Sequence, residues 1–92
     1  MAKKPYRGCS SAKEDANSLR DRAMQTEKRC AEGKLKCSSV VEDEIWEAFR
    51  LANNARTMAT GGACAEASKL VVRARHHYKL AHHTIARARR KP

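Results

Sequence analysis

Three runs of small or apolar residues recur at alternating steps of three and four positions, and this spacing constrains the fold more than any other feature. A mean spacing of 3.5 residues keeps one stripe of side chains facing a partner helix along the whole length of an α-helix. We call the three stripes the seams. They comprise Cys9, Ala12, Ala16, Leu19, Ala23, Thr26 and Cys30; then Val41, Ile45, Ala48, Ala52, Ala55 and Ala59; then Cys64, Ala67, Val71, Ala74, Tyr78, Ala81, Ile85 and Ala88.

Residues that start helices lie at the beginning of the first two seams. Ser11 is followed by Glu14, and Ser39 is followed by Glu42. A serine with a glutamate three residues later has the spacing of a capping box, in which each side chain bonds a free backbone N–H at the helix start. These pairs predict helix starts near residues 11 and 39.

Glycines mark the ends of the same segments. Gly33 follows the first seam, and two glycines at 61–62 follow the second, where a left-handed residue commonly ends a helix. The sequence therefore predicts an all-α fold, an antiparallel three-helix bundle with helices at about 10–32, 39–60 and 63–90. We expect one helical domain over 1–92, with frayed ends at 1–9 and 90–92, and it could be excised from a longer chain.

Alanine dominates the seams, which makes the predicted core thin. Burying an alanine stabilises a fold much less than burying a leucine, because the contribution follows the apolar area removed from water. We expect the larger apolar side chains beside the seams to fill the remaining space. They are Trp46, Phe49, Leu51, Met58 and Leu70.

The four cysteines fall near the ends of the predicted helices. In an up-down-up bundle Cys30 and Cys37 lie at one end, and Cys9 and Cys64 lie at the other. A disulfide requires Cα atoms within about 7 Å, whereas these helices are more than about 30 Å long. Of the three possible pairings, only Cys9–Cys64 with Cys30–Cys37 joins neighbours, so we predict two disulfides.

The alternative is that the cysteines are small, reduced core residues, as in cytosolic proteins. Their spacings contain no short ligand pair typical of zinc sites. Disulfides would indicate a protein that is exported or secreted without a visible signal peptide; without them we expect a cytoplasmic protein. A domain of a larger secreted effector would reconcile the bridges with the missing signal.

Positive charge is concentrated at the end of the chain. The net charge is +10, and residues 63–92 carry eight Lys or Arg against one acidic residue. Such an excess is typical of proteins that meet nucleic acid, anionic lipid or an acidic protein. No apolar run is long enough to span a membrane, and alanine seams lack the bulky apolar face of interfacial helices.

All four histidines lie within residues 76–83. The seam spacing places His76 and His83 on the outward face of the third helix with Lys79 between them, while His77 and His82 flank the seam on opposite sides. No two histidines have the i, i+4 spacing of helical metal sites, so we expect neither a metal nor another cofactor.

The first function hypothesis is a basic module that binds nucleic acid through phosphate contacts of the third helix. Part of the positive charge at the C-terminal end of the third helix would instead be balanced by the acidic residues at the start of the second helix. Base stacking would be minor, because Tyr6 is the one aromatic residue expected to be freely exposed. The expected binding residues are Arg73, Arg75, His76, Lys79, His83, Arg87, Arg89 and Arg90.

Two alternatives remain open. In a toxin-like, metal-independent nuclease, His76 and His83 would move protons while Lys79 steadies the phosphate charge, although a convex helix offers no pocket for such a site. A secreted effector domain could instead dock on an acidic protein. The alanine seams could also join two chains, so a homodimer is possible.

Overall fold

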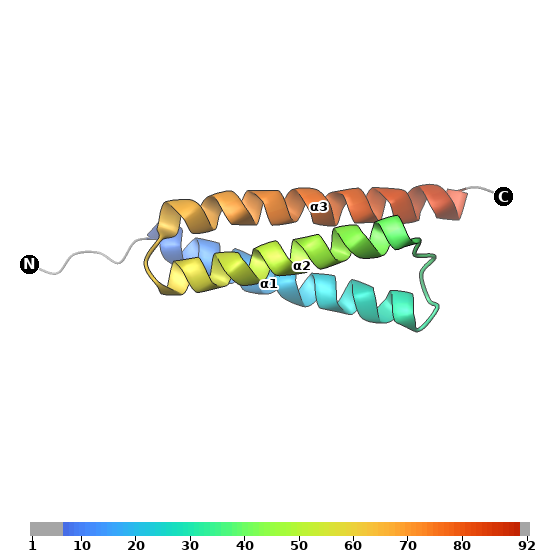
Figure 1. Cartoon of the computed structure of the whole chain (residues 1–92), viewed down its shortest axis with the longest axis horizontal. Helices are drawn as coiled ribbons and strands as arrows, with labels where there is room; N and C mark the ends of the chain where they lie inside the picture. Colours follow the sequence, from blue (N-terminus) through green and yellow to red (C-terminus); the bar gives the residue numbers. More distant parts are fainter. Residues whose placement is uncertain (1–6, 91–92) are drawn as a thin grey trace, which may run out of the picture.

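The structure, a computed structural model, describes the backbone of residues 7–90 and the side chains of residues 10–89. It consists of α1 (Arg7–Ala31), α2 (Ser39–Thr60) and α3 (Cys64–Arg90), with no strand in this part of the chain. The three helices lie side by side, and α2 runs antiparallel to the other two (Figure 1). This confirms the predicted all-α three-helix fold, although α1 begins three residues earlier than expected.

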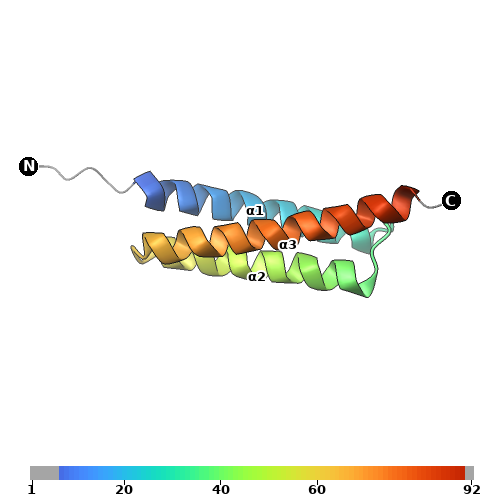
Figure 2. The ribbon, with the colours of Figure 1, turned by 90° about the horizontal axis from the view of Figure 1, so that it is seen from above.

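The seams form the core. Each seam residue with a described side chain is buried or half-buried. The buried residues form two clusters, one toward the α2–α3 turn and one toward the α1–α2 loop, and Tyr78 packs against both. Seen from above, α3 lies in front of α1 and α2 (Figure 2). Because the seams face one another within the chain, they do not offer the surface for a homodimer that their spacing alone would allow.

Neither predicted capping box forms. Ser38, rather than Ser39, is the N-cap of α2, and its hydroxyl oxygen accepts a hydrogen bond from the Val41 backbone N–H at 3.3 Å. Ser11 lies inside α1, because that helix begins at Arg7. Ser38 and Ser39 are both suited to cap α2, and in the structure Ser38 does so because its hydroxyl reaches the backbone of the third helical residue.

The glycines end α1 and α2 as predicted. Gly33 and Gly62 have φ of 76° and 89°, in the left-handed region that glycine adopts without steric cost. After α1, Lys34 N–H donates to Arg29 O and Gly33 N–H donates to Cys30 O, at 2.9 and 3.1 Å. This is the Schellman pattern, and the same pattern recurs at Gly62, so both turns satisfy carbonyls at the helix ends.

One disulfide ties the α1–α2 loop. Cys30 and Cys37 are bonded, with Cα atoms 5.6 Å apart, so the last turn of α1 is joined to the residue before the α2 cap. Leu35, within the bridged loop, packs against the nearer core cluster. This confirms one of the two predicted bridges. The other prediction, Cys9–Cys64, involves a Cys9 side chain that lies outside the described residues.

The larger apolar side chains do not all fill the core. Leu51 is buried, and Phe49 and Leu70 are half-buried against the core, as expected. Trp46 and Met58, however, remain 60% and 41% exposed, so the expectation for these two was wrong. Alanine seams let the helices approach closely, and a close-packed interior has no room left for further large side chains.

Within the described residues, no helix combines the length and the apolar character that crossing a membrane requires.

Candidate functional site

The outward side of α3 carries three Lys or Arg side chains, two histidines and two apolar side chains, and no acidic residue. Since Ala74, Ala81 and Ile85 face the core, the residues on the opposite side of the helix point away from α1 and α2. All of them are exposed. We call this surface the outer face of α3, and it comprises Val72, Arg73, His76, Lys79, Leu80, His83 and Arg87.

Several cations of α3 form no ion pair, although Arg73 lies near enough to Glu47 of α2 to help lower the pKa of that carboxyl. Among the described side chains, Arg73, Lys79, Arg87 and Arg89 form no ion pair. Arg75 differs, because its guanidinium lies 3.8 Å from the Asp15 carboxylate of α1. Arg90 was also predicted to bind nucleic acid, but its side chain lies outside the described residues.

The acidic start of α2 does not neutralise the described end of α3, contrary to expectation. Glu44 contacts His77 in the middle of α3, and Glu47 accepts two hydrogen bonds from Arg50, one turn along α2. The Arg50 hydrogen bond holds the pKa of Glu47 below its ordinary value. Because Glu44 and Glu47 contact other side chains, neither forms an ion pair with Arg87 or Arg89. The charges of these two arginines are therefore available to solvent or to a partner.

A polar hollow of about 420 Å³ adjoins the end of α3. It is lined by Arg89 and by the bridged loop residues Gly33, Lys34, Leu35 and Lys36. The Lys34 ammonium lies 3.4 Å from the Glu32 carboxylate, while Lys36 has no ion pair among the described side chains. The cationic surface of α3 therefore continues onto the α1–α2 loop.

His77 and His82 connect helices. The Nδ1 atom of His77 lies 3.2 and 3.3 Å from the two carboxylate oxygens of Glu44, which ties α3 to α2. The His82 ring stacks on Tyr78 with centroids 4.4 Å apart, and its Nε2 lies 3.5 Å from the Thr26 hydroxyl of α1. Partial burial lowers the pKa of His82. These two histidines thus contribute to the packing of the bundle.

His76 and His83 are exposed, as the seam spacing predicts. They lie two helical turns apart, about 10 Å along the axis, with Lys79 between them on the same face. The polar hollow beside Arg89 is lined by other residues, so it does not enclose this trio. The nuclease hypothesis therefore stays a prediction, and no contact of these three side chains distinguishes it from a solvated basic face.

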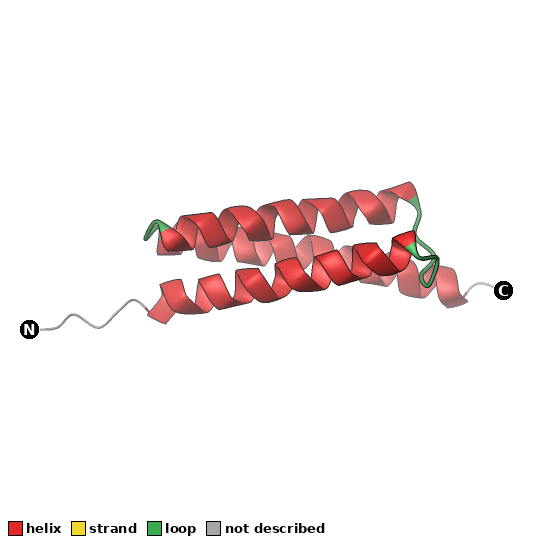
Figure 3. Ribbon diagram, turned by 90° about the horizontal axis from the view of Figure 1, so that it is seen from below, coloured by secondary structure: helices red, strands yellow, loops and turns green. Residues whose placement is uncertain are grey.

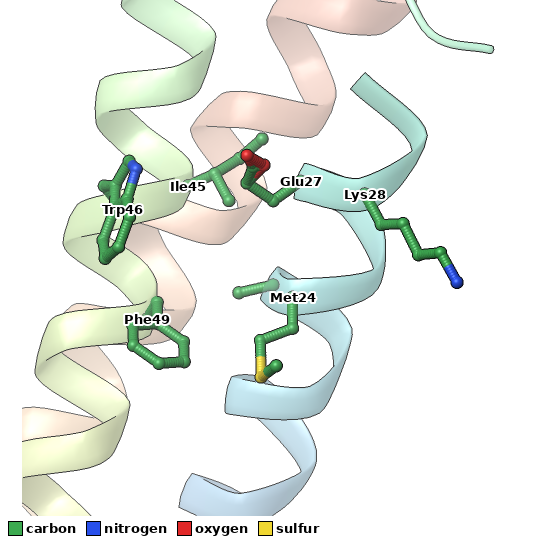
Figure 4. A pocket seen from close by; sticks show the side chains of 7 residues that line it. Met24, Glu27, Lys28, Ile45, Trp46 and Phe49 are labelled. Carbon is green, nitrogen blue, oxygen red and sulfur yellow. The ribbon is translucent and has the colours of Figure 1, made fainter. Parts of the chain in front are cut away.

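A second surface feature, which we did not predict from the sequence, is an apolar groove between α1 and α2 (Figure 4). Its volume is about 300 Å³. Trp46 and Phe49 meet edge to face with centroids 5.6 Å apart, and Met24 lies opposite them on α1. We call it the α1–α2 groove, and its lining residues are Ala23, Met24, Glu27, Lys28, Ile45, Trp46 and Phe49.

The groove contains an unsatisfied carboxylate oxygen. Oε2 of Glu27 is buried and has no hydrogen-bond partner among the described residues. Figure 4 shows the Glu27 carboxylate turned toward Ile45, while the ammonium of Lys28 points away from the other labelled side chains. The charge directed into the groove is therefore negative. A signal for the groove was present in the sequence, since Met24, Trp46 and Phe49 each directly follow a seam residue.

No cluster of three or more His, Cys, Asp or Glu side chains within the described part of the chain is arranged to hold a metal ion. No protein-family model matches the chain, and searches of curated proteins and of solved structures found no match either.

Proposed function

We propose that the protein binds an acidic partner through the outer face of α3, and that this partner is a nucleic acid held by its phosphates. The observation that supports this most strongly is the set of exposed cations without ion pairs, Arg73, Lys79 and Arg87. They extend about 21 Å along one helix. Duplex DNA carries one negative charge per about 1.7 Å, so several phosphates lie within reach of that span.

The contacts proposed are to the backbone rather than to bases. The exposed aromatic side chain, Trp46, lies on α2 beside the α1–α2 groove, not on α3. The expectation that Tyr6 alone is exposed among the aromatic residues was therefore wrong. The outer face itself nonetheless has no exposed Phe, Trp or Tyr ring, because Tyr78 is half-buried. A surface of cations without stacking platforms suits phosphate contacts with little sequence readout.

The experiment measures binding of fluorescently labelled RNA and DNA by anisotropy. The variant Arg73→Gln/Lys79→Gln/Arg87→Gln removes three cations of the outer face. If each holds one phosphate, affinity falls about a hundredfold at roughly 0.1 M salt. Arg56→Gln is the matched control, because Arg56 is an exposed cation of α2. Equal affinity of the triple variant and wild type would refute the proposal, and selective binding of an acidic protein would replace nucleic acid as the partner.

The same samples test the nuclease hypothesis. A His-dependent nuclease would shorten the labelled RNA or DNA over time without added metal. His76→Ala and His83→Ala would then each slow cleavage strongly. Intact oligonucleotide after long incubation with wild type, or unchanged cleavage by both variants, would exclude this activity.

We also propose a second disulfide between Cys9 and Cys64, and with it an oxidising compartment such as the one that an exported effector reaches. Cys64 is the first residue of α3, and the starts of α1 and α3 lie at the same end of the bundle (Figure 1). Mass mapping of unreduced peptides would detect a Cys9–Cys64 cross-link. Alkylation of Cys9 in the native, unreduced protein would contradict it.

A further inference from the structure

The α1–α2 groove combines an unpaired buried carboxylate oxygen with exposed apolar side chains. A buried carboxylate oxygen without a donor is costly, so Glu27 Oε2 is suited to accept a hydrogen bond from an N–H or ammonium group of a partner. Around it, Trp46 and Met24 expose 60% and 53% of their surfaces. The complementary partner is therefore an apolar side chain that carries a cation next to it.

The chain presents that combination on its opposite side. Leu80 is 41% exposed on the outer face of α3. His76, Lys79 and His83 surround it, at positions i−4, i−1 and i+3. The groove has an aromatic rim and the Glu27 carboxylate turned inward. It is therefore suited to bind an apolar side chain such as Leu80 that has N–H donors beside it.

We propose that the groove of one copy binds the outer face of α3 of a second copy. Leu80 enters the groove beside Trp46, and a neighbouring N–H group, of Lys79 or His83, donates to the Glu27 carboxylate. Charge complementarity favours this occupant. Helix α2, which forms one wall of the groove, has four acidic and two basic side chains, whereas α3 has seven basic and one acidic. Helix α1, which forms the other wall, has six basic and four acidic side chains, so the complementarity depends on α2 and on Glu27 of α1.

The two surfaces lie on opposite sides of the bundle. Figure 2 views the bundle with α3 in front, and Figure 3 views it from the other side with α1 and α2 in front. A copy that uses its groove therefore keeps its own α3 face free, and the reverse also holds. Such a heterologous contact joins the copies head to tail, in a row or a ring, rather than in a two-fold dimer.

The test is self-association of the full chain without nucleic acid. Because Trp46 is the single tryptophan, its emission reports on the groove directly. We expect the mass from light scattering to rise beyond that of a dimer with concentration, and the Trp46 emission to shift to shorter wavelength. The measurement is made at about 0.15 M salt, because screening limits the repulsion between copies that each carry +10.

Two variants separate the two surfaces. Trp46→Ala damages the groove and Leu80→Glu damages the outer face, and each alone should weaken association at least about tenfold. Mixed together they should form a 1:1 dimer that grows no further, since one copy supplies an intact α3 face and the other an intact groove. Met58→Ala is the control, because Met58 is as exposed as Leu80 but does not line the groove.

Circular dichroism verifies that the variants fold, which their exposed positions favour. The proposal is overturned if wild type stays monomeric at all concentrations, if it stops at a dimer, or if the mixed variants do not pair. It is also overturned if the Trp46 emission shifts with an added basic peptide but not with protein concentration. None of these results depends on nucleic-acid binding, so the two proposals fail separately.

Discussion

Loss of the Cys30–Cys37 disulfide should destabilise the bundle by an amount that can be calculated from the loop it closes. The bridge spans a sequence separation of 7 and fixes the end of α1 beside the start of α2. It also holds Leu35 against the core and Lys34 and Lys36 near Arg89. The perturbation is Cys30→Ala/Cys37→Ala, because alanine fits the half-buried sites without adding a polar group.

The expected loss is about 2.4 kcal/mol, the loop-closure entropy that a bridge of this length removes from the unfolded chain. For a domain of this size, that corresponds to a fall of roughly 10–20 °C in the unfolding midpoint. A core built mainly from alanines has little reserve, so the double variant should unfold at a clearly lower temperature than wild type.

The assay is thermal unfolding followed by circular dichroism at about 222 nm, a wavelength that reports helix content. The variant is preferred to a reducing agent, because a reductant would also break any second bridge. Matched unfolding midpoints for wild type and variant would refute the reasoning, since they would mean that the loop is held in place without its cross-link.

Three further predictions concern single residues. Ala74→Leu should destabilise by about 1–3 kcal/mol in urea unfolding, because Ala74 is fully buried between helices, whereas Ala65→Leu on the exposed side of α3 should change little. Ser38→Ala should cost about 1 kcal/mol in the same assay, because the Val41 N–H loses its cap. Burial lowers the pKa of His82, so the unfolded chain binds the proton more readily; stability should be complete above about pH 6.5 and decline as the pH falls below it. In His82→Gln the unfolding midpoint should lose that part of its acid dependence, and an unchanged profile would contradict the assignment.

The helices and their stops could be predicted because each rests on a local rule. The seams follow from the 3.5-residue spacing, and Gly33 ends α1 because a left-handed residue is needed there. The outward placement of His76 and His83 also followed from spacing alone. In each case the information lies within a few neighbouring residues.

The remaining features depend on distances between helices, which spacing does not fix. Trp46 stays outside because the alanine seams approach closely, and the groove exists because α1 and α2 leave space beside Ile45. The contacts of His77 with Glu44 and of His82 with Thr26 likewise join different helices. The sequence indicated that these residues flank the seams, but not which partner each one meets.

The salt dependence of nucleic-acid binding tests the central claim most directly. The claim is that the unpaired cations on the outer face of α3 hold phosphates, so each contact releases counterions when it forms. For duplex DNA, the plot of log affinity against log salt should be linear, and its slope should be shallower by about 2.7 in the Arg73→Gln/Lys79→Gln/Arg87→Gln variant. Equal slopes for wild type and this variant, with a shallower slope for Arg56→Gln instead, would place the contacts elsewhere and contradict the account.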